Sequence, residues 1–367
     1  MSADHIPIAA PQLGAAERDR IAAVLESGMI ADGPEVRGFE REFADYCGAD
    51  HGVATSNGTT ALHAALHALG VGPGDRVLTT PFTFIATANA VAFAGAEVDF
   101  VDIDPRTYNI DPDALEARLR AGERVDAVIA VHLYGLPADM TRLAELAEEY
   151  DFLLVEDAAQ AHGAEVEGRR VGSFGDAACF SFYPTKNMTT SEGGMITTTR
   201  ADVAERAARF VDHGRVSGYE HAEVGHNFRM TSLAAAIGRV QLERLPEFTR
   251  ARQANAAALT EYLEGSPVTT PHTPPDRTHV FHQYTVACDG IERDALKSYL
   301  GAKGIATGVY YPKPVHKQPA YEHLAVSAPV AEEASERVLS LPVHPGLSEA
   351  DVERIGTAVA NYVEVAR

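Results

Sequence analysis

Lysine is almost absent from most of this 367-residue sequence, and one exception is informative. Lys186 is the only lysine among the first 296 residues, and it ends the segment 180–186 (FSFYPTK). A lysine amine can lose its proton and attack a carbonyl to form a Schiff base, whereas a guanidinium stays charged at physiological pH. We therefore interpret Lys186 as a candidate nucleophile for an aldehyde. The alternative is a surface lysine without a function.

Asp157 is the second candidate, because it closes a strand-like segment that begins with the apolar run 152–155. A carboxylate in that place can keep a pyridine nitrogen protonated, and a pyridinium is a strong electron sink. Gln160 follows three residues later and could form a hydrogen bond with the 3'-oxygen that a pyridoxal ring carries. Both side chains also fit the plain role of capping a helix or loop. Together with a Schiff-base lysine, they favour pyridoxal 5'-phosphate (PLP) as the cofactor.

The segment 56–60 (SNGTT) is a candidate phosphate-binding turn between a strand and a helix. Gly58 permits close backbone approach, and Thr59 and Thr60 offer amides and hydroxyls at a helix N-terminus, where the dipole favours an anion. Ser181 lies close to the candidate lysine in sequence and could add a further hydroxyl. The turn matches neither GxGxxG nor a Walker loop, so it does not favour a nicotinamide or a nucleoside triphosphate.

Phe84 is a candidate for the flat surface against the cofactor ring, because it begins a helix directly after a predicted strand. Its alternative role is an ordinary core aromatic.

Composition and charge limit the class of protein. Hydrophobic residues make up 46% and charged residues 23% of the chain, as in ordinary globular proteins. The net charge of -21 argues against nucleic acid or an anionic membrane as a partner, since both require a basic face. It indicates either adaptation to high salt or simply an acidic enzyme.

The three cysteines are widely spaced and form no CxxC pair, so we expect no zinc thiolate site and no metal. The N-terminus resembles no signal peptide, and no apolar run is long enough to span a membrane. We therefore expect a cytoplasmic protein.

From about residue 50 to 200, short apolar runs alternate with amphipathic stretches, which predicts βαβ units and a mostly parallel sheet. Such sheets bind ligands at the carboxyl ends of their strands. The predicted strands are 52–55, 76–79, 97–101, 127–131, 153–156, 178–182 and 194–197. The predicted helices between them are 60–69, 85–93, 113–120 and 140–150.

We predict two domains. Residues 1–245 form a large α/β domain that binds PLP and includes two N-terminal helices between residues 15 and 46. Residues 246–367 form a smaller C-terminal domain with a strand near 283–288, a helix near 293–300 and a terminal helix from 349. A long helical stretch after residue 231 links them.

Taken together and in this order, these motifs resemble those of the sugar aminotransferases of the DegT/DnrJ/EryC1/StrS family. The resemblance implies the α/β architecture of fold-type I, aspartate aminotransferase-like PLP-dependent transferases, with a smaller C-terminal α+β domain. It runs from about residue 28 to the terminal helix and rests on 56–59 (SNGT), 156–160 (EDAAQ), 181–186 (SFYPTK), 225–230 (GHNFRM) and 311–316 (YPKPVH).

The resemblance also assigns roles to individual residues. By it, Lys186 holds the PLP aldehyde, Asp157 the pyridine nitrogen and Gln160 the 3'-oxygen. Phe84 stacks on the ring, and the phosphate is held by Gly58, Thr59, Thr60 and Ser181. Asn227 resembles an asparagine that reaches the phosphate from the neighbouring subunit, which implies a homodimer with composite sites. Arg229, Tyr311 and His316 fall where the family contacts the nucleotide sugar.

Two local departures from the family pattern concern the phosphate site. Ser191 stands where glycine is common before Glu192, and Thr60 stands where a smaller residue is frequent. Lys186 itself places the chain with the transaminases, because dehydrating members of the family carry histidine at that position.

The implied activity is transfer of an amino group from glutamate to a keto-deoxysugar linked to a nucleotide, within deoxysugar or polysaccharide biosynthesis. We favour a 4-keto-6-deoxyhexose over a 3-keto sugar. Two other classes remain open: a PLP-binding regulator without turnover, and a nicotinamide-dependent sugar oxidoreductase. A desulfurase would need an exposed, activated cysteine, whereas Cys179 lies in an apolar run.

Overall fold

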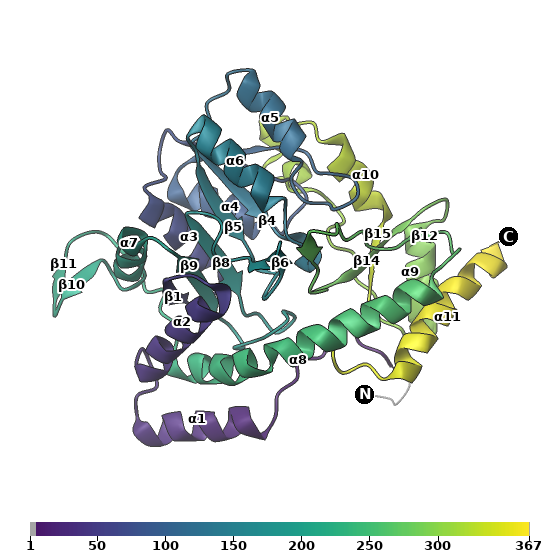
Figure 1. Cartoon of the computed structure of the whole chain (residues 1–367), viewed down its shortest axis with the longest axis horizontal. Helices are drawn as coiled ribbons and strands as arrows, with labels where there is room; N and C mark the ends of the chain where they lie inside the picture. Colours follow the sequence, from purple (N-terminus) through teal and green to yellow (C-terminus); the bar gives the residue numbers. More distant parts are fainter. Residues whose placement is uncertain (1–4, 367) are drawn as a thin grey trace.

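The computed structural model describes residues 5–366 and centres on a seven-stranded sheet (Figure 1). The strand order is β1-β9-β8-β5-β4-β2-β3. All neighbours from β3 to β8 are parallel, and only β9 runs against its two neighbours. The bounds are β1 His51–Thr55, β2 Arg76–Thr79, β3 Glu97–Phe100, β4 Ala127–Val131, β5 Leu153–Asp157, β8 Ala177–Ser181 and β9 Gly194–Thr198. All seven strands predicted from the sequence are present, with ends shifted by one residue at most.

Helices cover both faces of this sheet, because its central strands bury both of their faces. Along β4, Ile129 packs into one apolar cluster and its neighbours Val128 and Ala130 into another on the opposite face. Such a continuous buried run is typical of a parallel strand between two helical layers. The first cluster includes α3 (Gly58–Leu69), α4 (Ala86–Ala94) and α7 (Ala201–Val211), and the second includes α5 (Pro112–Arg120) and α6 (Met140–Tyr150).

A third apolar cluster continues the second face toward the N-terminal helices. It joins β8 to α2 (Pro34–Cys47) through Phe39, Phe43, Phe180 and Phe182, whose rings lie in edge-to-face or tilted contacts 4.8–5.8 Å apart. The helix α1 (Ala15–Ser27) lies beside α8 (Ser232–Tyr262). The two helices predicted between residues 15 and 46 are therefore confirmed.

The C-terminal part has its own core and a smaller, antiparallel sheet of β12 (Val268–Thr269), β14 (Tyr284–Cys288) and β15 (Val338–Leu341). Two helices, α9 (Arg293–Ala302) and α11 (Glu349–Ala366), cover it. Ile6 also belongs to this core and bridges Ile305, because its amide donates to the Gly304 carbonyl and its carbonyl accepts from the Ala306 amide. The N-terminal arm therefore packs on the C-terminal unit before the chain enters the large one.

The helix α8 joins the two units (Figure 1). It is 31 residues long, so the predicted domain boundary between residues 245 and 246 falls inside it, next to Pro246. The boundary stays a prediction, since one continuous helix carries side chains of both cores.

The remaining elements are short. A hairpin of β10 (Arg215–Ser217) and β11 (Glu220–His221) projects from the large unit, and β6 (Glu165–Val166), β7 (Arg169–Arg170) and β13 (Arg277–Thr278) form a small sheet. The helix α10 (Pro329–Arg337) precedes β15, and the 3-10 turns are η1 (Leu133–Gly135), η2 (Val315–Lys317) and η3 (Glu322–Leu324). Among residues 5–366, none of the helices combines the length and the apolar character needed to cross a lipid bilayer.

The packing of α3 on the sheet can be tested by truncating one of its side chains. Leu66 is fully buried in the first apolar cluster, so Leu66→Ala should destabilise the fold by about 2–5 kcal/mol through lost burial and an unfilled cavity. The matched control is Leu25→Ala on α1, where the side chain is 57% exposed and the loss should be small. Thermal unfolding followed by circular dichroism measures both, and equal melting temperatures for the two variants would contradict this packing.

Candidate active site

The candidate residues converge on one edge of the large sheet. Asp157 ends β5, Ser181 ends β8, and Gly58 follows the end of β1. These three strands point in the same direction, so their carboxyl ends share that edge, where parallel sheets bind ligands. Gly58 and Ser181, which are 123 positions apart in the sequence, are therefore brought together by the sheet.

Lys186 lies on the long connection between β8 and β9, which is fixed at several points. The Lys186 amide donates to the Tyr183 carbonyl at 2.9 Å, closing a turn. The next residue, Asn187, donates from Nδ2 to the Val280 carbonyl at 3.0 Å, and Thr189 donates its amide to Gln241 Oε1 at 3.4 Å. The lysine is thus held on an ordered loop that contacts both α8 and the segment that leads into β14.

Burial lowers the pKa of Lys186 to about 8, and the negative charge of Asp157 opposes this effect. A free amine is the reactive form, and a pKa near 8 leaves a useful fraction of it at neutral pH. The surface-lysine alternative therefore does not describe this side chain.

Asp157 is only 5% exposed. Its Oδ2 accepts from the Thr87 hydroxyl at 2.7 Å and its Oδ1 from the Ala159 amide at 3.2 Å. Burial raises the pKa of Asp157, while these two hydrogen bonds and the charge of Lys186 oppose the rise. A buried acid without a full counter-charge is suited to a positively charged ring nitrogen, which would restore its ionised form.

Gln160 is oriented by the backbone. Its Oε1 accepts from the Tyr134 amide at 2.7 Å, so its Nε2 faces the other way and donates to the Tyr311 hydroxyl at 3.2 Å. Nε2 has a second hydrogen, which remains for a ring oxygen. Tyr134 itself adopts a left-handed conformation (φ 59), the kind of local strain often found at functional sites.

The candidate phosphate site combines the start of α3 with the end of β8. A Cβ atom on Gly58 would lie 2.8 Å from the Ser181 Cβ, so only glycine permits this approach. The first amides of α3, those of Gly58 and Thr59, have no partner within the helix and can bind an anion.

Thr60 differs from its neighbours because its polar groups are already used. Its amide donates to Asn57 Oδ1 at 2.9 Å, and its hydroxyl bonds both the amide and the carbonyl of Asn57 in a capping box. This capping role was missed in the sequence, although Asn57 directly before a glycine and two threonines is a recognisable signal for it. A phosphate contact from Thr60 stays a prediction.

Phe84 is 57% exposed, and its ring centroid lies 6.1 Å from that of Tyr311. The alternative of an ordinary core aromatic does not fit this exposure. An uncovered aromatic face beside the candidate site is suited to stacking on a flat ring.

Three candidates have side chains that bond elsewhere, although the backbone of Arg229 forms a bridge with Thr55 at the end of β1. Asn227 is exposed and accepts from Arg229 Nε at 3.2 Å, and Arg229 also forms an ion pair with Asp212 at 2.6 Å. His316 is 2% exposed, and its Nε2 lies 3.0 Å from a carboxylate oxygen of Glu332 on α10. Burial against α10 does not support a contact between His316 and a sugar, and the sequence carries no signal for that burial.

Thr87, which donates to Asp157, is a candidate site residue that sequence analysis missed. It lies one helical turn after Phe84, so the prediction of a helix there could have placed it on the side facing Asp157.

Cys179 is fully buried, and burial raises its pKa far above the ordinary value, which makes the thiol inert and argues against a desulfurase.

These features fit PLP. The buried Asp157 suits the pyridine nitrogen, Gln160 the ring oxygen, the α3 terminus with Ser181 the phosphate, Phe84 the ring face and Lys186 the aldehyde. The assignment of these five functions to these residues stays a prediction.

Comparison with known proteins agrees with the geometry. Residues 11–360 match the DegT/DnrJ/EryC1/StrS aminotransferase family, and the chain belongs to this family. It is a PLP-dependent sugar aminotransferase, which excludes the nicotinamide-dependent oxidoreductase considered from the sequence.

Among its relatives is the UDP-N-acetyl-3-dehydro-alpha-D-glucosamine 3-aminotransferase of Acidithiobacillus ferrooxidans, 42% identical over 92% of this chain and 91% of that protein. Another is the GDP-perosamine synthase of Caulobacter vibrioides, 42% identical over 97% of both chains. Among solved structures, DesV of S. venezuelae is 41% identical with a TM-score of 0.91 and covers 95% of this chain and 94% of its own.

The pKa of Lys186 predicts how the cofactor-free protein captures PLP. Because burial depresses this pKa to about 8, the capture rate should rise about tenfold per pH unit below 8 and level off above it. Asp157→Asn removes the charge that opposes the depression, so its midpoint should lie at lower pH. Stopped-flow absorbance at several pH values measures the rate.

The matched control is Asp151→Asn, at an exposed position just before β5, which should leave the midpoint unchanged. A midpoint above pH 10 in the wild type would show that the lysine lies in solvent.

The contact between Gly58 and Ser181 predicts that Gly58→Ala weakens PLP binding. The added Cβ would push the start of α3 away from β8, and we expect a loss of about tenfold, or about 1.4 kcal/mol. Equilibrium dialysis measures the dissociation constant. Gly301→Ala on α9, where a Cβ meets no atom within 4 Å, should bind as the wild type does. Equal binding by all three proteins would place the phosphate elsewhere.

Proposed function

We propose that this enzyme transfers the amino group of glutamate to the keto carbon of a nucleotide-linked deoxysugar. The observation that carries the proposal is that the half-buried Lys186 lies within electrostatic influence of the buried acid Asp157, in a chain whose relatives are named as nucleotide-sugar aminotransferases. The presence of lysine rather than histidine at this position supports transamination over dehydration. The activity belongs to deoxysugar or polysaccharide biosynthesis.

PLP, when bound, supplies the electron sink that makes the α-hydrogen of an amino acid acidic. Lys186 Nζ, as a free amine, would take this proton from the donor's Cα and, in the second half of the exchange, would deliver a proton to the keto carbon of the sugar. Asp157 keeps the ring nitrogen protonated, and its two hydrogen bonds hold the carboxylate in place. Gln160 would donate a hydrogen bond to the ring oxygen and Phe84 would stack on the ring face, and together they would hold the cofactor beside Lys186.

The position of the keto group is a finer proposal. We favour a 4-keto-6-deoxyhexose, since the segments 227–231 and 311–316 resemble those of enzymes for such sugars. A 3-keto sugar is the second candidate, supported by relatives named for 3-amino products. Tyr311 borders the site beside Gln160 and is the substrate contact that the geometry supports best; Arg229 is proposed to act in a partner's site.

We also propose a homodimer with composite sites. The projecting hairpin and the segment after it expose apolar side chains, among them Tyr219 and Val224, the latter 89% exposed. A groove next to them is lined by aromatic and imidazole rings, including His63, Phe93 and Phe228. An exposed apolar surface of this kind is typical of an interface, and a second copy covering it would bring its Asn227 close to a neighbouring site.

The amino-transfer proposal is tested by Lys186→Arg. An arginine cannot form the Schiff base, so both the visible absorbance of bound cofactor and the conversion of keto-sugar nucleotides with glutamate should disappear. Mass analysis of the amino product over a panel of 3-keto and 4-keto substrates identifies the sugar. The control is Lys297→Arg, at an exposed position of α9. Turnover retained by Lys186→Arg would refute the assignment.

The composite site is tested by mixing inactive subunits. If Asn227 serves the neighbouring site, random pairing of Lys186→Arg with Asn227→Asp subunits leaves one intact site in each heterodimer and restores about a quarter of wild-type activity. Mixing Lys186→Arg with Asp157→Asn is the control, since every site then carries a defect. Recovery in neither mixture, despite heterodimers seen by native mass spectrometry, would contradict the composite site.

A further inference from the structure

Arg252 is a buried cation without a matching charge. It lies on α8, is 5% exposed, and forms no ion pair with any of the residues 5–366. Buried guanidinium groups are normally paired with a carboxylate, because leaving such a charge uncompensated is strongly unfavourable. In a chain with 52 acidic residues, this lack of a partner is a specific feature of the site.

The hydrogen bonds of Arg252 leave one side of its guanidinium free. Nη1 donates to the carbonyls of Phe281 and His282 at 3.1 and 3.3 Å. Nε is buried and has no partner within the described part of the chain. Nε and Nη2 lie on the same edge of a guanidinium, the edge that binds carboxylates with two parallel hydrogen bonds. The free edge is therefore an anion-binding geometry without its anion.

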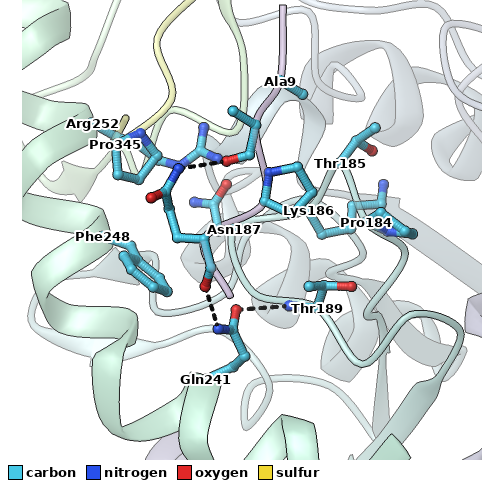
Figure 2. Close-up of a pocket in the computed structure, with 13 residues that line it drawn as sticks. Ala9, Pro184, Thr185, Lys186, Asn187, Thr189, Gln241, Phe248, Arg252 and Pro345 are labelled. Atoms are coloured by element: carbon cyan, nitrogen blue, oxygen red, sulfur yellow. Dashed lines mark hydrogen bonds between the residues drawn. The ribbon is translucent and has the colours of Figure 1, made fainter. Parts of the chain in front are cut away.

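Arg252 borders a cavity that also borders the loop of Lys186 (Figure 2). The cavity lies between the N-terminal arm, this loop and α8. Figure 2 shows Arg252 on the α8 side of the cavity and Lys186 on the loop opposite. No carboxylate lines the cavity; its other polar side chains are those of Gln12, Thr185, Asn187, Thr189 and Gln241.

The surroundings reinforce the positive character of this region. His162 and His282 are buried nearby, and burial together with the charges of Lys186 and Arg252 lowers the pKa of both. Neutral imidazoles cannot supply the missing negative charge, nor can they add to the positive one. The positive charge of Arg252 therefore has no counter-charge from these side chains and is available to an anionic ligand.

We propose that Arg252 binds a small anionic group through its free Nε and Nη2 edge. Two sources share this chemistry: the carboxylate end of the amino donor, and a free halide such as chloride. The donor source rests on the proposed function, since it assumes an amino acid substrate. The halide source does not.

Calorimetric titration of the PLP-loaded enzyme tests the proposal with two probes. Glutarate carries both carboxylates of glutamate but no amine, so it binds without reacting, and chloride represents the free anion. We expect Arg252→Gln to weaken binding of the true ligand at least about tenfold, because both donors of the edge change. The matched control is Arg250→Gln, an exposed position on the same helix, which should bind both probes as the wild type does.

The two sources give different results. Loss of glutarate binding in Arg252→Gln assigns the site to the amino donor, and an effect on chloride alone assigns it to a free halide. Wild-type affinity for both probes in Arg252→Gln overturns the proposal. If that variant does not fold, Arg252→Lys serves as the second test, because it keeps the charge but not the paired donors. Wild-type affinity for both probes in Arg252→Lys would also overturn the proposal. Because glutarate does not react, the result is independent of whether a keto sugar is aminated.

Discussion

The site depends on the balance between burial of Lys186 and the charge of Asp157. Burial alone disfavours both charged forms, raising the pKa of the acid and lowering that of the amine. Each charge partly offsets this effect on the other. As a result, part of the Lys186 amine is unprotonated at neutral pH. A cationic ring nitrogen beside Asp157 would stabilise the ionised form of this carboxyl group. The remaining contacts of the site serve to keep this pair at the same sheet edge.

Much of the site could be predicted because its residues belong to local patterns. Asp157 and Ser181 follow apolar strands, and Gly58 lies in a strand-to-helix turn, so the direction of the strands brings them together. Lys186 could be selected because it is the only lysine among the first 296 residues. Each of these signals lies in a few neighbouring residues, so it can be recognised without knowledge of tertiary contacts.

Other features could not be read from the sequence, since they depend on distant contacts. The burial of His316 depends on α10, which lies at its side only after the C-terminal unit folds. Thr60 bonds to Asn57 and caps its own helix, so its polar groups are already used. A prediction of phosphate binding from the sequence overlooks this competing local hydrogen bond. Arg252 looks like any helical arginine until the carbonyls of residues 281 and 282 and the cavity are placed around it.

The helix α8 contacts the reactive loop and the small unit at the same time. Gln241, near its start, accepts from the Thr189 amide, while Arg252, three turns later, holds the segment that leads into β14. One continuous helix therefore connects the lysine loop to the smaller core. Because the Thr189 amide and the carbonyls of residues 281 and 282 bond to this same helix, a displacement of the C-terminal unit would also shift the anchor of the loop that carries the amine.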